Sequence, residues 1–222
     1  MAVQTYMRWV HPLRGEIPPA EFLPIADATG LAVAVSRAAL ARLAGDIGAI
    51  RARCGAQVRI SFGTLRQHLT SGQLERDCAE LLGPLALASD QLELRIAERT
   101  LAGISRPERA LAGLAEIGAA LVIDEVGRGF SSLPRLAQLP LGAIQIDRAL
   151  VTAAAPGSSA ERACRAAAAL AQALGVTAIA PGIDKPEARA RLLALGFSQG
   201  IGDAFPALPI VESQPALRRA AG

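Results

Sequence analysis

Short apolar runs alternate with longer amphipathic runs along almost the whole chain, and this alternation limits the folds that the chain can adopt. In the amphipathic runs, apolar residues recur at helical spacing; these runs are Ala32–Arg53, Thr100–Ile117, Ala160–Leu174 and Pro186–Leu195. The short runs have the length and composition of strands; they are Thr5–Val10, Val58–Phe62, Gln91–Ile96, Ala120–Val126, Ala143–Asp147, Thr177–Ala180 and Gly196–Ile201. Strands that alternate with helices are typical of a parallel sheet with crossover helices.

The number of these units predicts a closed or nearly closed sheet. So many strand and helix units within 222 residues favour a TIM-type (β/α) barrel over an open doubly wound sheet. A G-x-G-x-x-G turn after a strand, which would indicate a dinucleotide-binding domain, is missing from the sequence. Because no linker, repeat or low-complexity segment divides the chain, we predict one domain over residues 1–222.

Composition excludes several classes of function. Hydrophobic residues make up 51% and charged residues 19% of the chain, which is enough to form a core. The formal charge of +3 comes without a basic cluster interleaved with aromatics, so we expect no nucleic-acid partner. The sequence has neither a signal peptide nor an uncharged run of 18 residues, which predicts a cytoplasmic protein without membrane contact. The widely spaced Cys54, Cys78 and Cys164 predict free thiols rather than a zinc site.

The most informative polar segment lies at the end of the predicted strand Ala120–Val126, after its apolar run through Ile123. Asp124 and Glu125 come directly after it, and a glycine-rich turn through Gly127 and Gly129 follows. Residues at the carboxyl ends of barrel strands line the functional face, where two carboxylates would suit Mg²⁺ or Mn²⁺. Because neighbouring strand residues alternate in direction, only one of the two should point into the barrel mouth. The alternative, a helix cap plus a surface acid, fits this segment equally well.

This segment resembles the D-D-F-G-T-G-Y-S-S-L signature of EAL domains, and further blocks match that family in order. These blocks are Met7-Arg8-Trp9-Val10-His11-Pro12, Pro19-Ala20-Glu21-Phe22 with Gly30-Leu31, Leu92-Glu93-Leu94-Arg95-Ile96-Ala97-Glu98, Ile144-Gln145-Ile146-Asp147-Arg148, and Ser198-Gln199-Gly200. The resemblance implies a (β/α) barrel and the two-metal hydrolysis of cyclic di-GMP. The family's first strand would precede this sequence. The barrel is therefore expected to lack that strand, unless the sequence is part of a longer chain.

The resemblance also shows where this chain departs from the family's catalytic pattern. Of eight polar site positions, Asp124 is unchanged, and Glu125 and Asp184 keep only a carboxylate. The positions of the family's metal ligands carry Gln4, Ser61, Arg95 and Pro181, and the position of its active-site lysine carries Gln145. Arg95 places a permanent cation where a ligand is needed. We therefore expect no catalytic residues, no metal and no other cofactor, and hence no enzyme activity.

Two functions remain open besides an unexpected residual phosphodiesterase activity. The first is a metal-independent cyclic di-GMP receptor, a role known among degenerate members of the family. Its ligand-binding residues would be Arg8, Glu21, Arg95, Asp124, Glu125, Asp184 and Gln199. Ion pairs are an equally supported alternative for two of these: Arg8 with a strand-end acid, and Arg95 with Asp124 or Glu125.

The second function is a protein-interaction module or homodimer that no longer binds the nucleotide. It would use the apolar residues Phe130, Leu133 and Leu136, which follow the acidic pair; for most of them a role in the core is the alternative. Arg128 is expected to be solvated. We expect no nucleophilic triad, because His11 and His68 lack an acid at a useful spacing and Ser131 and Ser132 have no histidine nearby.

Overall fold

The computed structural model describes residues 2–82, 85, 87–88, 90–128 and 133–205. Its main sheet consists of parallel strands in the order β1, β4, β5, β6, β7, β8, β9. Their bounds are Ala2–Gln4 (β1), Arg59–Gly63 (β4), Leu92–Ala97 (β5), Ala120–Val126 (β6), Ala143–Ile146 (β7), Thr177–Pro181 (β8) and Gln199–Ile201 (β9). A separate antiparallel hairpin joins Trp9–His11 (β2) to Gly15–Ile17 (β3).

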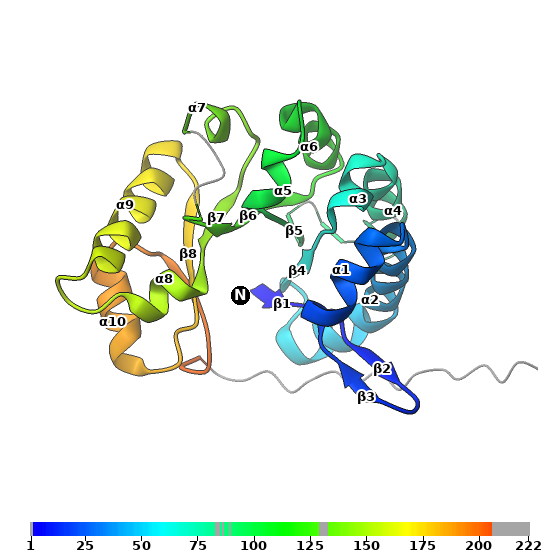
Figure 1. The fold of residues 1–222 in the computed structure, drawn as a ribbon, viewed down its shortest axis with the longest axis horizontal. Coiled ribbons are helices and arrows are strands. Elements are labelled where there is room, and N and C mark those ends of the chain that lie inside the picture. The colour runs from blue at the N-terminus through cyan, green and yellow to red at the C-terminus, as the bar shows by residue number, and fades with distance from the viewer. Residues whose placement is uncertain (1, 83–84, 86, 89, 129–132, 206–222) are drawn as a thin grey trace, which may run out of the picture.

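Helices cover the outer side of this curved sheet (Figure 1). They are Pro19–Ala28 (α1), Ala32–Cys54 (α2), Arg66–Thr70 (α3), Gln73–Leu82 (α4), Glu98–Ala102 (α5), Pro107–Glu116 (α6), Leu133–Leu136 (α7), Arg148–Ala153 (α8), Ser159–Leu174 (α9) and Pro186–Ala194 (α10). Within the described residues, β1 and β9 are the two edge strands, so the sheet is open between them. The predicted (β/α) barrel with one strand fewer than the family pattern is confirmed.

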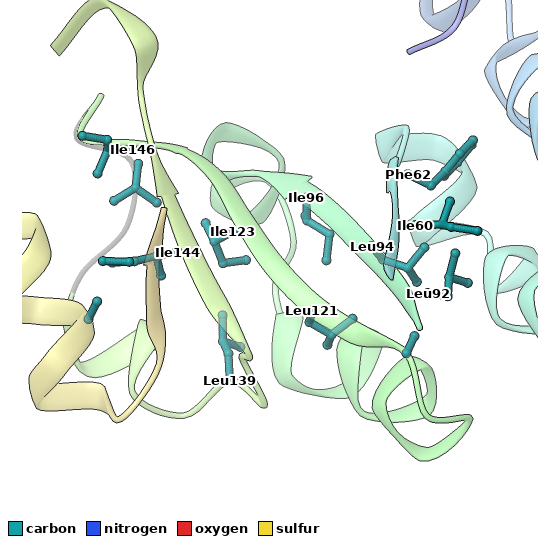
Figure 2. Packing of buried hydrophobic residues seen from close by; sticks show 14 of the residues in the cluster. Ile60, Phe62, Leu92, Leu94, Ile96, Leu121, Ile123, Leu139, Ile144 and Ile146 are labelled. Carbon is teal, nitrogen blue, oxygen red and sulfur yellow. The ribbon is translucent and has the colours of Figure 1, made fainter. Parts of the chain in front are cut away.

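The core lies between the outer face of the sheet and the helices. Alternate strand residues point outward and are almost fully buried, among them Ile60, Leu94, Ile123 and Ile144 (Figure 2). Burying each such side chain contributes about 1.5–3 kcal/mol. The residues between them point into the barrel, where Val122, Ala143 and Ile179 form a second, smaller apolar cluster. The strand pattern therefore places the polar residues Arg95, Asp124 and Gln145 on the inner face.

The predicted strand Thr5–Val10 is wrong. The strand is Ala2–Gln4, and the backbone N–H and the hydroxyl of the next residue, Thr5, both donate to the carbonyl oxygen of Ser61 on β4, each at 2.9 Å. The chain then enters the β2–β3 hairpin, which was not predicted. Its turn is stabilised by His11 Nδ1, which accepts from the backbone N–H groups of Leu13 and Arg14 at 3.1 and 3.2 Å.

The predicted helix Thr100–Ile117 is in fact two helices, α5 and α6. Gly103 ends α5, and Pro107 occupies the first turn of α6, where a missing backbone N–H costs nothing. The other predicted strands and helices lie within a few residues of their observed bounds. In the part of the chain that the structure describes, no helix has the length and apolarity required to cross a membrane.

Candidate functional site

The inner-face polar residues meet at the carboxyl ends of four strands. Gln4 ends β1, Arg95 lies near the end of β5, Asp124 near the end of β6, and Gln145 on β7. Parallel strands bring these ends to one edge of the sheet, so residues more than 140 positions apart in the sequence come within hydrogen-bonding distance. The cluster contains three of the positions at which the chain departs from the family pattern, together with the retained Asp124.

Arg95 lies at the centre of this cluster. Its NH2 nitrogen donates to the carbonyl oxygen of Thr5 at 2.9 Å, and its NH1 nitrogen donates to Gln4 Oε1 at 3.3 Å and Asp124 Oδ2 at 3.5 Å. The side chain is only 7% exposed, and its Nε atom has no hydrogen-bond partner among the described residues. The ring of Tyr6 lies over the guanidinium, with its centroid 5.1 Å from Cζ. The cation is thus firmly held through NH2 and loosely held through NH1.

A chain of hydrogen bonds fixes the orientation of the two glutamine amides. Asp124 Oδ1 can only accept, so Gln145 presents its Nε2 to it at 2.8 Å. Gln145 Oε1 then accepts from Gln4 Nε2 at 2.7 Å, which leaves Gln4 Oε1 to accept from the Tyr6 hydroxyl at 2.7 Å and from Arg95. Each hydrogen bond of this chain therefore joins one donor to one acceptor.

Burial raises the pKa of Asp124 above its usual value, although the nearby Arg95 and the hydrogen bond from Gln145 act in the opposite direction. Asp124 Oδ1 also accepts from the backbone N–H of Glu125 at 2.7 Å. A carboxylate in this environment is held in place by neutral and cationic donors of the protein itself.

Glu125 points away from the cluster, as the alternation of side chains predicts. The pairing of β6 with β7 shifts register between Ile123 and Val126, and Glu125 has a φ of 60°. Its carboxylate pairs with Arg99 instead. The following Gly127 has a φ of 110°, and a Cβ there would come within 2.5 Å of Leu150 Cδ1. The positive φ therefore favours glycine in the turn after β6, and a larger residue would also have to displace the Leu150 side chain.

Asp147, which directly follows β7, is a second carboxylate with partners in the protein. Its side chain caps α8 by accepting from the backbone N–H of Ala149 at 2.9 Å, and Arg128 binds it through Nε and NH2, each at 2.8 Å. Arg128 is exposed, as expected for a solvated side chain, and in addition it forms this ion pair. Although its side chain is 52% exposed, it pairs with a buried carboxylate, which sequence spacing alone did not indicate.

Three other predicted ligand-binding residues, Arg8, Glu21 and Asp184, have partners of their own. Arg8 pairs with Glu16 of β3, with Nε 2.9 Å from Oε1 and NH2 2.5 Å from Oε2. Arg14 NH2 lies 3.0 Å from Glu21 Oε1, and Arg148 NH2 lies 2.9 Å from Asp184 Oδ2. Gln199 lies on the edge strand β9, at a small pocket of about 100 Å³. Their roles in ligand binding stay predictions.

Two residues of the cluster were missed at the sequence level. Thr5 and Tyr6 were not among the predicted site residues, yet the Thr5 carbonyl and the Tyr6 ring are direct partners of Arg95. Tyr6 could have been predicted as an aromatic residue next to a strand end, close to the site at which Arg95 introduces a positive charge. Ser61, by contrast, is buried, with no hydrogen-bond partner for its hydroxyl among the described residues.

The expectation that His68 lacks an acid partner is also wrong. His68 Nε2 lies 2.8 Å from Asp77 Oδ2, and its Nδ1 lies 2.8 Å from Ser36 Oγ. The three side chains meet because α2, α3 and α4 pack together. Ser36 and His68 are both fully buried, so this arrangement joins helices and offers no access to a substrate.

Of the apolar residues assigned to an interface, Leu136 is buried, Leu133 is 60% exposed, and Phe130 lies outside the described residues, as do Ser131 and Ser132.

The fold and the strand-end cluster define a (β/α)-barrel domain with an acidic position at the carboxyl end of its sheet. Residues 1–207 match the EAL domain family, and the chain belongs to it. Two relatives are the cyclic di-GMP phosphodiesterase RocR of Pseudomonas aeruginosa, 30% identical over 210 residues, and the probable cyclic di-GMP phosphodiesterase PdeN of Escherichia coli K12, 28% identical over 201 residues.

The match to these relatives covers only part of their length. It includes 92% of this chain but 52% of RocR, and 89% of this chain but 39% of PdeN. Among solved structures, the PaMucR phosphodiesterase in complex with c-di-GMP is 26% identical with a TM-score of 0.80, over 89% of this chain and 84% of that one. The predicted family is thereby confirmed, and the chain spans about half or less of the length of these two curated relatives.

Proposed function

We propose that this EAL domain is a metal-independent receptor for cyclic di-GMP that does not hydrolyse the nucleotide. The observation that carries the proposal is the position of the Arg95 guanidinium, whose NH1 lies between Gln4 Oε1 and Asp124 Oδ2. By the resemblance, Gln4 and Arg95 occupy positions of metal ligands. A fixed cation at this place can attract a phosphate without the help of a divalent ion.

The residues at the strand ends do not fit a pair of divalent ions. Such ions need several oxygen ligands, but Pro181 has no side-chain oxygen and Gln4 supplies only a neutral amide. A divalent ion at about 5 Å from the Arg95 guanidinium would be repelled by several kcal/mol even at an effective dielectric constant of ~20. Among the described residues, no three His, Cys, Asp or Glu side chains gather closely enough to hold a metal. We therefore derive no hydrolytic step for this chain.

The hydrogen bonds of Arg95 support a role in phosphate binding. Its two NH1 contacts are long, at 3.3 and 3.5 Å, so a phosphate oxygen can compete with them for NH1, whereas NH2 stays anchored to Thr5. A phosphate oxygen forms shorter, charge-assisted bonds with a guanidinium than a neutral amide does. The names of RocR and PdeN and the PaMucR complex support cyclic di-GMP as the ligand.

Calorimetry with cyclic di-GMP, in EDTA and in Mg²⁺ or Mn²⁺, tests the proposal. We expect the same Kd in both buffers and no linear dinucleotide product. The Arg95→Ala variant should bind about 10- to 150-fold more weakly, as expected for the loss of a hydrogen bond to a charged group. Arg53→Ala, which removes an exposed arginine at the end of α2, should bind as the wild type does.

Two results would overturn the proposal, and each of them leaves a different function for the domain. Metal-dependent turnover of cyclic di-GMP would show that the site still assembles its ions. Absence of binding in every buffer, at high micromolar nucleotide, would leave the protein-interaction module as the remaining function of the barrel.

A further inference from the structure

A groove in the outer helix layer lies between two neighbouring pairs of helices. One wall is formed by the turn between α3 and α4 and the start of α4, and the other by the loop between α5 and α6 and the first turns of α6. Helices α4 and α6 also contact each other directly (Figure 1). The groove has a volume of about 510 Å³, which is typical of sites that bind a ligand, and it shares no residue with the strand-end cluster.

The floor of this groove is apolar. The side chains of Leu69, Leu74 and Leu114 form its base and are almost fully buried. Ile104 and Ala110 also line it and are partly exposed. An aliphatic side chain of a partner that entered the groove would exchange water for these apolar groups, which favours its binding.

The rim of the groove carries more positive than negative charge. Arg106 and Arg109 line it with exposed side chains, against a single acidic residue, Glu75, among the described lining residues. In the part of the chain that the structure describes, neither arginine forms an ion pair, and the Glu75 carboxylate lies against Gly113 of α6 instead. The two guanidinium groups are thus available to carboxylates of a partner.

The wall that carries the arginines is held in place by the protein itself. Arg66 NH2 donates to the carbonyl oxygen of Gly103 at 3.4 Å, and Arg135 NH2 donates to the carbonyl oxygen of Ile104. Pro107 then restricts the backbone where α6 begins. Little of this wall remains to be ordered on binding, which lowers the entropic cost of docking.

We propose that this groove docks a partner protein through a segment in which one large apolar side chain is flanked by carboxylates. The apolar side chain fills the groove, and the carboxylates pair with Arg106 and Arg109. Charge complementarity selects this occupant, because a basic segment would be repelled at the rim and a neutral one would leave both guanidinium groups without a partner. The inference is independent of the proposed receptor function, since it uses none of the residues assigned to nucleotide binding.

Titration calorimetry at low salt with three synthetic peptides tests this docking site. The peptide Gly-Asp-Glu-Leu-Asp-Glu-Gly should bind the wild type, with one peptide per chain. Replacing its acids by Asn and Gln, or its leucine by serine, should weaken binding at least about 5-fold. Added salt should weaken the binding of the acidic peptide but not that of the neutral one. Equal binding of the neutral peptide, or absence of binding by the acidic one, overturns the proposal.

Substitutions locate the peptide on the groove. Arg106→Ala combined with Arg109→Ala should weaken binding about 5- to 25-fold. Ala110→Phe, which fills the groove but keeps its charges, should abolish binding, and Glu75→Gln, which removes the repelling acid, should strengthen it about 2- to 5-fold.

The matched controls are Arg53→Ala and Ala52→Phe, at exposed positions of α2, and both should bind the peptide as the wild type does. The arginine variants change only exposed side chains, so they keep the test valid if Ala110→Phe does not fold. An unchanged Kd of the double arginine variant, or of a folded Ala110→Phe, would place the peptide elsewhere on the protein and overturn the proposal.

Discussion

The Arg95 guanidinium and the Asp124 carboxylate form an ion pair across neighbouring strands, with NH1 3.5 Å from Oδ2 and side chains that are 7% and 19% exposed. The other carboxylate oxygen is bound by Gln145 and by the backbone N–H of Glu125. The protein's own groups thus supply the positive charge and the hydrogen bonds that a carboxylate at this position requires. The pair joins β5 to β6 at the carboxyl edge of the sheet, so it bears on stability as well as on ligand binding.

Removing the cation of this pair should destabilise the barrel. Arg95→Gln leaves the Asp124 carboxylate buried without a positive partner, and we expect the free energy of unfolding at pH 7 to fall by about 3 kcal/mol. Arg95→Gln combined with Asp124→Asn leaves no unpaired charge and should recover a large part of that loss. Urea denaturation of both variants and of the wild type measures the difference. Equal stability of Arg95→Gln and the wild type would show that the pair is structurally unimportant.

The core side chain next to Arg95 provides a test of the barrel itself. Leu94 is fully buried on the outer face of β5 (Figure 2). Leu94→Ala should therefore lower the free energy of unfolding by about 2–5 kcal/mol, because it removes buried methyl groups and leaves a cavity. Leu13→Ala, at an exposed position, should change it by less than about 0.5 kcal/mol. Chemical denaturation distinguishes the two variants. A small effect of Leu94→Ala would contradict the placement of this side chain on the outer, buried face of β5.

The strands of the sheet were predictable because their apolar runs are unambiguous. Leu92, Leu94 and Ile96 alternate with polar residues and match the observed β5 within one residue. The end of β1 was not predictable in this way. There, Thr5 donates twice to the carbonyl oxygen of Ser61 and gives its own carbonyl to Arg95. Both partners lie more than 50 residues away, so no local pattern contains this information.

The sequence predicted which charged residues belong to the candidate site, but not which of them contact one another. The sequence offered either Asp124 or Glu125 as a partner for Arg95, and the structure selects Asp124. The alternation of side chains along β6 predicts that only one of the two points inward, but that this one is Asp124, and that Glu125 pairs with Arg99, is seen only in the folded chain. The Tyr6 contact likewise depends on where the chain leaves β1. Tertiary geometry of this kind follows from packing and cannot be obtained from the spacing of residues.

The three cysteines should differ sharply in reactivity. Cys78 and Cys164 are buried, and burial raises the pKa of Cys78 to about 12 and that of Cys164 above its ordinary value. Only the thiolate reacts, so both should resist a thiol reagent in the folded protein at pH 8. Cys54, which is half-buried, should react first. A colorimetric thiol assay should find fast labelling at Cys54 and labelling of the other two only in denaturant; fast labelling of all three would contradict the packing.

His68 should make the stability of the barrel depend on pH. Burial lowers its pKa below the ordinary 6.5, although its hydrogen bond to Asp77 acts in the opposite direction and Arg37 lies nearby. Because Asp77 accepts from Nε2–H, Nδ1 is the nitrogen that accepts from Ser36 in the neutral ring. The contact between α2, α3 and α4 therefore depends on an uncharged imidazole.

The sign of this pH dependence follows from proton binding in the two states. As pH falls through about 6.5, the unfolded chain takes up a proton at His68 but the folded chain does not until a lower pH, so stability is lost in that window. The free energy of unfolding of the wild type relative to His68→Gln should be largest above pH 7. It should then decrease toward pH 5 with a slope of up to about 1.4 kcal/mol per pH unit. Urea denaturation at several pH values measures both proteins, and parallel curves would contradict a role for the neutral ring.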